Sequence, residues 1–371
     1  MTRTFDLSHV GAPGVQAILD GLRVDGENVR RHDLDAETGT LTVEFARRGA
    51  AEHVEAFVAQ MTRMHRRIAR KVLVEQHAAD LTLLDVDAAL LSHPDVYVLG
   101  DGLIGLRGAL LDLFRFFERT FRGFAGDYLA EEEHYPVMVP AELLAEIGYF
   151  GHFPQQVTFC SHLRGDLPAL EAFGQTAADR VPEHVPLAPP GHVLSPAVCL
   201  PCYRQQQGAV VHGTRVLTMQ NHVFRYEGSS FRPLRRAWDF TVRDIVFFSD
   251  YAELVRLRQE VMDRTIRLCR ELDLEVTIEV ASDPFFLDAN RDKAIYQRMG
   301  EVKYELLFPV ANRSPIAASS FNLHRDYYTS VYNTHRADGS LVESACIGFG
   351  LERWVYGFIA QKGLDRSRWP I

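Results

Sequence analysis

The sequence predicts an α+β fold in which an antiparallel β-sheet is flanked by helices. Strand-like segments with alternating apolar residues recur along the chain, and long connections separate most of them. Residues 108–123 and 251–272 instead carry apolar residues at helical spacing. A last strand that ends at Gly350 runs directly into an apolar helix. Strands that are separated by long connections and accompanied by amphipathic helices favour an antiparallel sheet with the helices packed against it.

The composition indicates a soluble globular chain with one large domain and room for a smaller one. The chain has 371 residues, of which 47% are hydrophobic and 24% are charged. Its net charge of −9 argues against a broad nucleic-acid-binding surface. No apolar run approaches the length of a membrane span and no basic-then-apolar signal opens the chain, so we expect a cytoplasmic protein without membrane contact. Five cysteines fit a reducing compartment and favour thiols or metal ligands over disulfides.

Residues 1–80 are expected to form a small α/β module, and residues 81–371 the main domain. Apolar residues follow helical spacing near residues 15–22, alternate over 40–45, and return to helical spacing from Ala51 to about Val74. The module is therefore predicted to end in a long helix. Basic residues at 63–71 could contact an acidic partner or RNA, although a solvated helix face is the commoner explanation.

The main domain is expected to begin with a hairpin that turns at Gly100 and Gly102, followed by the helix over 108–123. A strand closed by Pro140 and a helix over 141–147 come next. Residues 181–191 are rich in proline and histidine, which indicates a surface loop.

Cys199 and Cys202 form a Cys-x-x-Cys pair, with flanks that are expected to be strand and loop. The pair could be redox-active or half of a zinc knuckle, but the sequence contains no second Cys-x-x-Cys. Cys199 and Cys346 could also be small buried side chains, as free cysteines often are.

Two segments carry arginines that are hard to explain by packing. Arg225 and Glu227 lie two residues apart on one face of a predicted strand, which a short polar loop joins to a second strand. Arg353 lies in the first turn of the helix that follows Gly350. An unpaired buried guanidinium costs several kcal/mol, whereas a phosphate would pair with it bidentately. The alternative is a glycine-kinked core strand with an arginine that pairs with a nearby carboxylate.

These two segments resemble motifs 2 and 3 of class II aminoacyl-tRNA synthetases. Motif 2 is matched by Phe-Arg-x-Glu at 224–227 with a downstream Arg236 and Phe240, and motif 3 by Gly-Phe-Gly-Leu-Glu-Arg at 348–353. The helix and proline-closed strand up to Pro140 have the layout of motif 1, which builds the dimer interface in that class.

From about residue 84 onward the chain resembles amino acid:[carrier protein] ligases, truncated homologues of the atypical zinc-containing seryl-tRNA synthetases. The resemblance covers about three quarters of the chain and excludes residues 1–80. It runs through Gly102–Gly105, Phe153–Pro154, Phe159–Cys160, Leu194–Cys199, Phe224–Glu227, Asp283–Phe286, Ser320–His324, Ala345–Arg353 and Trp369–Pro370.

The resemblance implies a zinc-dependent enzyme that activates a small amino acid with ATP and loads it onto the phosphopantetheine thiol of a carrier protein. The family's Cys, Glu and Cys zinc ligands fall on Cys199, Asp244 and Cys346. Two thiolates and a carboxylate leave one tetrahedral position for the substrate amine. Asp244 departs from the usual Glu, and its shorter side chain could alter which amino acid fits or abolish metal binding.

The resemblance also implies a nucleotide site. Arg225 would bind the α-phosphate and the substrate carboxylate, Arg353 the γ-phosphate, and Glu227 the adenine amino group. Nucleotide contacts are also expected of Arg236 and Gly350. Glu343 would hold Mg²⁺ with help from Asn322; the alternative is a surface glutamate and a satisfied strand asparagine.

The sequence therefore favours an amino-acid-adenylating homodimer that binds an acidic carrier protein through Arg291, Lys293 and Arg298 on a predicted helix. A seryl-type tRNA synthetase is the first alternative, although the acidic charge and the small N-terminal module leave little surface for tRNA. A non-catalytic synthetase-derived subunit is the second alternative, and an ATP-dependent amide ligase is the third.

Overall fold

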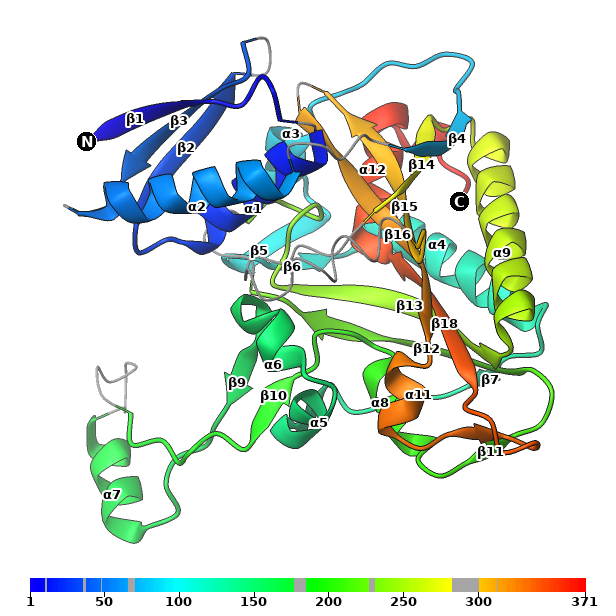
Figure 1. Cartoon of the computed structure of the whole chain (residues 1–371). Helices are drawn as coiled ribbons and strands as arrows, with labels where there is room; N and C mark the ends of the chain where they lie inside the picture. Colours follow the sequence, from blue (N-terminus) through cyan, green and yellow to red (C-terminus); the bar gives the residue numbers. More distant parts are fainter. Residues whose placement is uncertain are drawn as a thin grey trace.

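A computed structural model describes residues 1–10, 12–35, 38–47, 49–65, 71–176, 185–226, 231–281, 300–311 and 313–371. Its centre is an eight-stranded sheet in the order β4-β14-β15-β16-β18-β13-β12-β7 (Figure 1). Neighbours pair antiparallel except for the short β7, which pairs parallel with β12. The strands are β4 (Val72–Gln76), β7 (Glu131–Glu132), β12 (Arg215–Phe224), β13 (Asp239–Ser249), β14 (Val276–Val280), β15 (Lys303–Val310), β16 (Arg313–Arg325) and β18 (Glu343–Gly350). The predicted α+β class is confirmed.

Three long helices cover one face of this sheet: α4 (Gly108–Gly126), α9 (Tyr251–Glu271) and α12 (Leu351–Lys362). The predicted helices over 108–123 and 251–272 are thus confirmed. Their apolar stripes bury a core in which the rings of Phe121 on α4 and Phe349 on β18 stack with centroids 4.0 Å apart. Asp250 caps α9 by accepting a hydrogen bond from the backbone N–H of Glu253.

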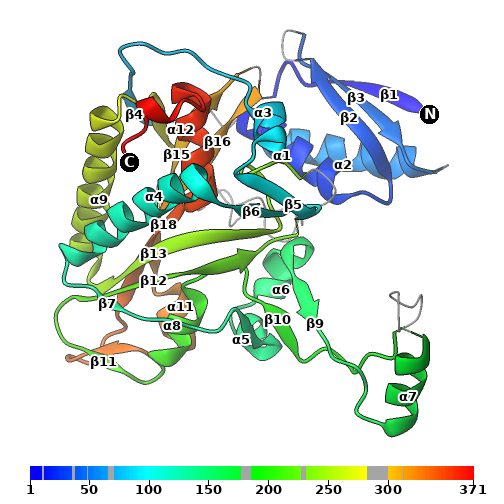
Figure 2. The same ribbon diagram turned by 180° about the vertical axis from the view of Figure 1, so that it is seen from behind.

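Shorter elements cover the opposite face and form a second core (Figures 1 and 2). A small sheet β8-β10-β9 lies here, and α7 projects away from the body of the molecule. A strand (His192–Leu194) and a short loop precede Cys199 as expected, but Cys202 lies in α8, so the expectation of strand and loop is wrong on that side; Pro201 in the first turn favours a helix start. The elements are β8 (Met138–Pro140), α5 (Ala141–Glu146), α6 (Tyr149–His152), a 3₁₀ turn (Pro154–Gln156), β9 (Thr158–Cys160), α7 (Leu167–Thr176), β10 (His192–Leu194), α8 (Leu200–Gln205), β11 (Val210–Val211), α11 (Tyr327–Val331) and β17 (His335–Arg336).

A hairpin and a short helix lie beside the N-terminus of α4. They are α3 (Asp87–Ser92), β5 (Val96–Gly100) and β6 (Leu103–Leu106), and a 3₁₀ turn (Arg366–Arg368) ends the chain. Gly102 has a φ of 72° at the tip of the hairpin, as the expected glycine turn requires. None of the helices in the described ranges is long and apolar enough to cross a membrane.

The N-terminal residues form a separate three-stranded sheet with two helices and a core of their own. The elements are β1 (Thr2–Asp6), α1 (Ala12–Val24), β2 (Val29–Asp35), β3 (Thr40–Phe45) and α2 (Ala50–His65). The prediction that the second helix continues to about Val74 is wrong, because Val72–Gln76 form strand β4. This strand pairs with β14 and covers an edge of the large sheet that would otherwise be open.

The start of the large sheet thus lies within residues 1–80, and the division at residue 80 stays a prediction. Of the basic residues expected on the helix, Arg63 is exposed on α2, and Lys71 forms an ion pair with Glu301. Arg66, Arg67 and Arg70 lie outside the described residues.

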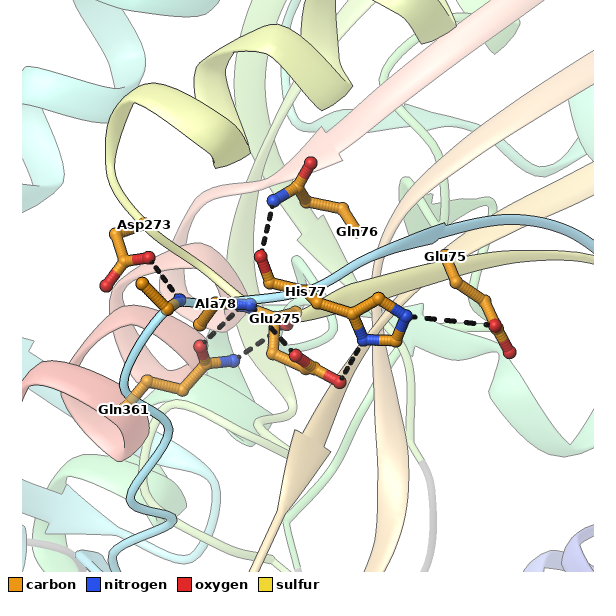
Figure 3. A network of polar contacts seen from close by, with 8 residues as sticks. Glu75, Gln76, His77, Ala78, Asp273, Glu275 and Gln361 are labelled. Atoms are coloured by element: carbon orange, nitrogen blue, oxygen red, sulfur yellow. Dashed lines mark hydrogen bonds and ion pairs between the residues drawn. The ribbon is translucent and has the colours of Figure 1, made fainter.

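The segment after β4 is fixed to the large domain by a network of polar contacts (Figure 3). The backbone N–H groups of Ala78 and Ala79 donate to the carboxylates of Glu275 (3.0 Å) and Asp273 (2.7 Å). The Gln361 amide at the end of α12 bonds both backbone groups of Glu275, each at 2.8 Å. The connection to the N-terminal module is therefore held against the α9–β14 turn and α12 together.

We predict that Gln361→Leu lowers the free energy of unfolding by about 1–3 kcal/mol, because it leaves the N–H and C=O of Glu275 without their partners. Chemical denaturation measures this change. Gln259→Leu is the matched control, since Gln259 is exposed and its bond to Asp263 lies on the surface of α9. Equal effects of the two substitutions would contradict the structural role of Gln361.

Candidate active site and metal centre

Three buried side chains with potential metal-ligating atoms meet on the sheet face opposite the long helices. The ligand atoms of Cys199, Asp244 and Cys346 all lie within 4.8 Å of one another. Among the residues that the structure describes, no other three His, Cys, Asp or Glu side chains gather in this way. Cys199 immediately precedes α8, Asp244 lies on β13, and Cys346 lies on β18. The structure therefore brings together all three predicted ligands.

The pairing of β13 with β18 explains how two of these residues meet. Asp244 lies directly opposite Gly348, and Cys346 lies two residues along the same face of β18. A Cβ atom at position 348 would lie 2.8 Å from the Asp244 Oδ1 atom. Gly348 therefore provides the space that the Asp244 carboxylate occupies.

Asn322 on the neighbouring strand β16 fixes the ligand-bearing strand from the other side. Its Nδ2 donates to the backbone oxygen of Cys346 (3.2 Å) and to Ser320 Oγ (3.1 Å). The Asn322 side chain thus contacts the candidate metal centre through the backbone of one ligand. Its predicted help in Mg²⁺ binding stays a prediction.

Without a cation, the buried surroundings disfavour the negatively charged forms of Asp244 and Cys346. Burial raises the pKa of Asp244 to about 6, although hydrogen bonds from the two cysteines and the positive charge of Arg225 act in the opposite direction. The hydrogen bond with Cys199 and burial raise the pKa of the Cys346 thiol well above its usual range. A divalent cation would reverse this balance by favouring both thiolates and the carboxylate. Two sulfur donors and one oxygen donor fit Zn²⁺ and do not fit Mg²⁺ or Ca²⁺.

Two of the predicted arginines approach one aromatic ring beside this cluster. The guanidinium carbons of Arg225 and Arg353 lie 5.7 Å and 6.0 Å from the centre of the Phe240 ring. Arg225 Nε donates to the backbone oxygen of Pro196 (2.8 Å). Arg353 donates to the backbone oxygens of Arg235 (3.1 Å) and Ala317 (3.0 Å). Backbone carbonyls thus orient both guanidinium groups next to a flat apolar surface.

The other predicted residues are more widely distributed. Gly350 precedes the first turn of α12, and Arg236 donates to Asp20 of the N-terminal helix α1. Glu343 lies at the far end of β18, about 23 Å from Gly350 at 3.3 Å per strand residue. There it lies 3.7 Å from Arg325 and lines a cavity of about 310 Å³. The structure does not bring Glu343 to Arg225 or Arg353.

Glu227 lies outside the described residues, as do Arg291, Lys293 and Arg298 of the predicted carrier-binding helix. The sequence interpretation missed the roles of Gly348, Arg235 and Asp20. The spacing of Gly348 from Cys346 could have indicated a shared strand face. No local sequence signal connects Asp20 with Arg236, because 216 positions separate them.

Comparisons with known proteins place the chain in a family. Amino acid–[acyl-carrier-protein] ligase 1 of Bradyrhizobium diazoefficiens is 30% identical over 238 residues, which are 63% of this chain and 72% of that protein. Ligase 2 of the same organism is 30% identical over 242 residues, which are 64% of this chain and 71% of that protein. The type-2 serine–tRNA ligase of Methanothermobacter thermautotrophicus is 27% identical over 253 residues, which are 64% of this chain and 48% of that protein.

The chain belongs to the family of amino acid–[acyl-carrier-protein] ligases and type-2 serine–tRNA ligases. It spans about half the length of the type-2 serine–tRNA ligase from Methanothermobacter thermautotrophicus. No family model matches the chain.

Solved structures agree on the fold. The Methanopyrus kandleri seryl-tRNA synthetase, solved with A. aeolicus tRNASec, has a TM-score of 0.69 at 21% identity, and the match covers 93% of this chain and 72% of that chain. The cytoplasmic serine–tRNA ligase of Naegleria fowleri, solved with AMP, has a TM-score of 0.59 at 9% identity over 84% of this chain and 76% of that chain. The predicted class II synthetase-like architecture is thus confirmed.

We predict that Gly348→Ala lowers the free energy of unfolding by about 1–3 kcal/mol, because the added methyl group displaces the buried Asp244 carboxylate. Urea denaturation measures the change. Gly123→Ala on α4 is the control, since nothing lies within 4 Å of its added Cβ and alanine favours a helix. An unchanged unfolding curve for Gly348→Ala would contradict the proposed contact.

Proposed function

We propose that this protein activates a small amino acid with ATP and transfers the aminoacyl group to the phosphopantetheine thiol of a carrier protein. The observation that carries the proposal is the buried cluster of Cys199, Asp244 and Cys346 beside Arg225. The two carrier-protein ligases, at 30% identity over more than two thirds of their length, support the same conclusion.

Cys199, Asp244 and Cys346 would hold Zn²⁺, which would supply a Lewis-acidic position for the amine of the substrate. A three-residue ligand set leaves that position open, as in functional zinc sites. Asp244 has a shorter side chain than the glutamate of the family pattern, but its carboxylate lies within reach of both thiols. This proximity supports a metal site despite the substitution.

The chain's own residues would position the reactants and balance their charge. Arg225 lies near Asp244 and would pair with the substrate carboxylate and the α-phosphate. Attack of that carboxylate on the α-phosphorus forms the aminoacyl-adenylate and expels pyrophosphate. Attack of the carrier thiol on the adenylate carbonyl then forms the thioester and releases AMP.

Arg353 would bind the terminal phosphate, Phe240 would offer its ring to the adenine, and Gly350 would let the nucleotide approach the backbone. Glu227 would accept from the adenine amino group. Mg²⁺ would accompany ATP, but the position of Glu343 at the far end of β18 gives no support to its predicted metal role. We therefore leave Glu343 out of the proposed site.

A seryl-type tRNA synthetase is the second candidate. The type-2 serine–tRNA ligases are 24–30% identical to the chain. The match to the Methanopyrus kandleri enzyme covers 93% of the chain, whereas residues 81–371 make up 291 of 371 residues, or 78%. This match therefore extends into the N-terminal module, which favours the tRNA alternative.

The charge of the N-terminal module argues against a broad tRNA-binding surface. Residues 1–80 contain eleven Lys and Arg residues and twelve Asp and Glu residues, so their formal charge is 11 − 12 = −1. Binding of tRNA depends on clustered basic side chains. A non-catalytic subunit is disfavoured because Arg225, Arg353 and the three candidate ligands are all present.

The first test combines metal analysis with ATP–pyrophosphate exchange across a panel of amino acids. We expect one zinc ion per chain and exchange with a small amino acid, and we expect Cys346→Ala to lose both. Cys269→Ala is the matched control, because Cys269 is equally buried but lies in the core on the other sheet face. Exchange that survives in Cys346→Ala, or that needs no metal, would contradict the zinc site.

The acceptor is tested with the labelled amino acid that supports exchange. We expect label on a phosphopantetheinylated carrier protein and none on tRNASer. Label on tRNASer alone would establish the seryl-type tRNA synthetase instead.

The predicted homodimer is tested by light scattering on the same preparation.

A further inference from the structure

The N-terminal module makes a partly buried ionic contact with the segment that carries Arg236. Asp20 on α1 accepts a hydrogen bond from Arg236 Nη2 (2.8 Å), and the side chains are 20% and 18% exposed. Arg23, one turn further along α1, also bonds the Asp20 carboxylate. Figures 1 and 2 show α1 on the side of the module that faces β5 and β6.

The segment around Arg236 is a tight turn that several elements hold in place. The backbones of Arg232 and Arg236 exchange hydrogen bonds of 2.9 Å and 3.0 Å. Arg353 donates to the backbone oxygen of Arg235 (3.1 Å), and Trp238 N–H donates to Gly102 in the β5–β6 hairpin (3.0 Å). The turn therefore lies in direct contact with an arginine of the proposed nucleotide site.

Positive charge accumulates at this junction. Among the described residues, Arg235, Arg236 and Asp20 all influence the Arg23 guanidinium. Tyr356 contacts both Arg235 and the Asp87 carboxylate, so these three arginines and two aspartates carry a formal charge of 3 − 2 = +1. His32 adds no charge near neutral pH, because burial and the neighbouring Arg23 lower its pKa to about 4; the exposed Asp33 lies on the rim. A local excess of positive charge attracts a polyphosphate chain even though the whole protein carries a net charge of −9.

One donor at the junction also lacks a partner. Arg235 Nη1 is buried with no hydrogen-bond partner among the described residues, and its guanidinium lies 5.7 Å from the centre of the Tyr356 ring. A buried unsatisfied donor costs free energy that an anionic ligand would recover. This donor points to a ligand independently of the Asp20 contact.

We propose that Asp20 is a positioning residue that holds Arg236 in the orientation that binds the phosphates of ATP, so that the N-terminal module completes the nucleotide site. The proposal rests on the proposed function and extends it to residues outside the catalytic part. Without Asp20, repulsion from Arg23 and Arg235 would turn the flexible Arg236 side chain away. ATP would then have to offset both that repulsion and the entropy of ordering the side chain.

The test measures ATP binding by calorimetry on the full chain, because binding does not require the reaction to proceed. We expect Asp20→Asn to raise the Kd for ATP about tenfold, the equivalent of one charge-assisted hydrogen bond. Adenosine, which has no phosphate, should bind both proteins equally. Glu55→Gln is the matched control, because Glu55 pairs with Arg3 within the module.

A double-mutant comparison separates positioning from simple docking of the module. If Asp20 acts through Arg236, then Asp20→Asn should weaken ATP binding no further in an Arg236→Gln background. Additive effects, an unchanged Kd, or equal loss of adenosine binding would overturn the proposal. If Asp20→Asn does not fold, Asp20→Glu, which keeps the carboxylate, is compared with Asp20→Ser, which removes it: Asp20→Glu should bind ATP more tightly than Asp20→Ser, and equal Kd values for the two variants would overturn the proposal.

Failure of the proposed function gives a different result. ATP binding without amino-acid-dependent exchange would refute the proposed reaction, while the Kd comparison would still decide the role of Asp20. Absence of ATP binding by the wild type would overturn both.

Discussion

The register of β13 against β18 is the constraint on which both the core and the candidate site depend. It places Asp244 opposite Gly348 and next to Cys346 on one face. On the other face it buries Ile245 and Phe349 beneath the long helices. A shift by one residue would exchange the two faces, moving the carboxylate into the apolar core. The same strand pairing therefore specifies folding and chemistry, which ties the geometry of the ligands to the most buried part of the protein.

The neighbouring Arg243 shows how this sheet accommodates charge on both faces. Its side chain is only 3% exposed and points away from Asp244, toward Glu118 on α4 and Glu132 on β7. Two carboxylates offset the free-energy cost of burying this guanidinium. The Asp244 carboxylate instead has hydrogen bonds from two thiols, and burial raises its pKa to about 6. The charge of this arginine is paired within the chain, although its buried Nε has no hydrogen-bond partner among the described residues. The Asp244 cluster would be satisfied by a cation, and this difference separates a structural charge from a candidate ligand.

The sequence predicted the features that depend on local pattern and on a close family resemblance. The long helices, the class II sheet and the meeting of Cys199, Asp244 and Cys346 belong to this group. It mistook Val72–Val74 for the end of a helix because their apolar spacing fits either structure, whereas these residues begin strand β4, which pairs with the edge of β14. Glu343 is expected to hold Mg²⁺ because it lies three residues before Cys346, but it lies at the opposite end of strand β18 from Gly350 and Arg353. The contact between Asp20 and Arg236 depends on how two separate cores pack, which no local pattern encodes.

Two of the contacts that the structure describes between the N-terminal segment and the large domain have different consequences. Gln361 and Glu275 hold the connecting segment through backbone groups, so this attachment contributes to stability whether or not a ligand is bound. Asp20 instead contacts a charged side chain next to Arg353, where a bound polyphosphate would change the local field. A domain attached only for stability would need no carboxylate among three guanidinium groups, because neutral packing avoids the desolvation cost. The position of Asp20 thus favours a module that acts on nucleotide binding over one that only extends the surface.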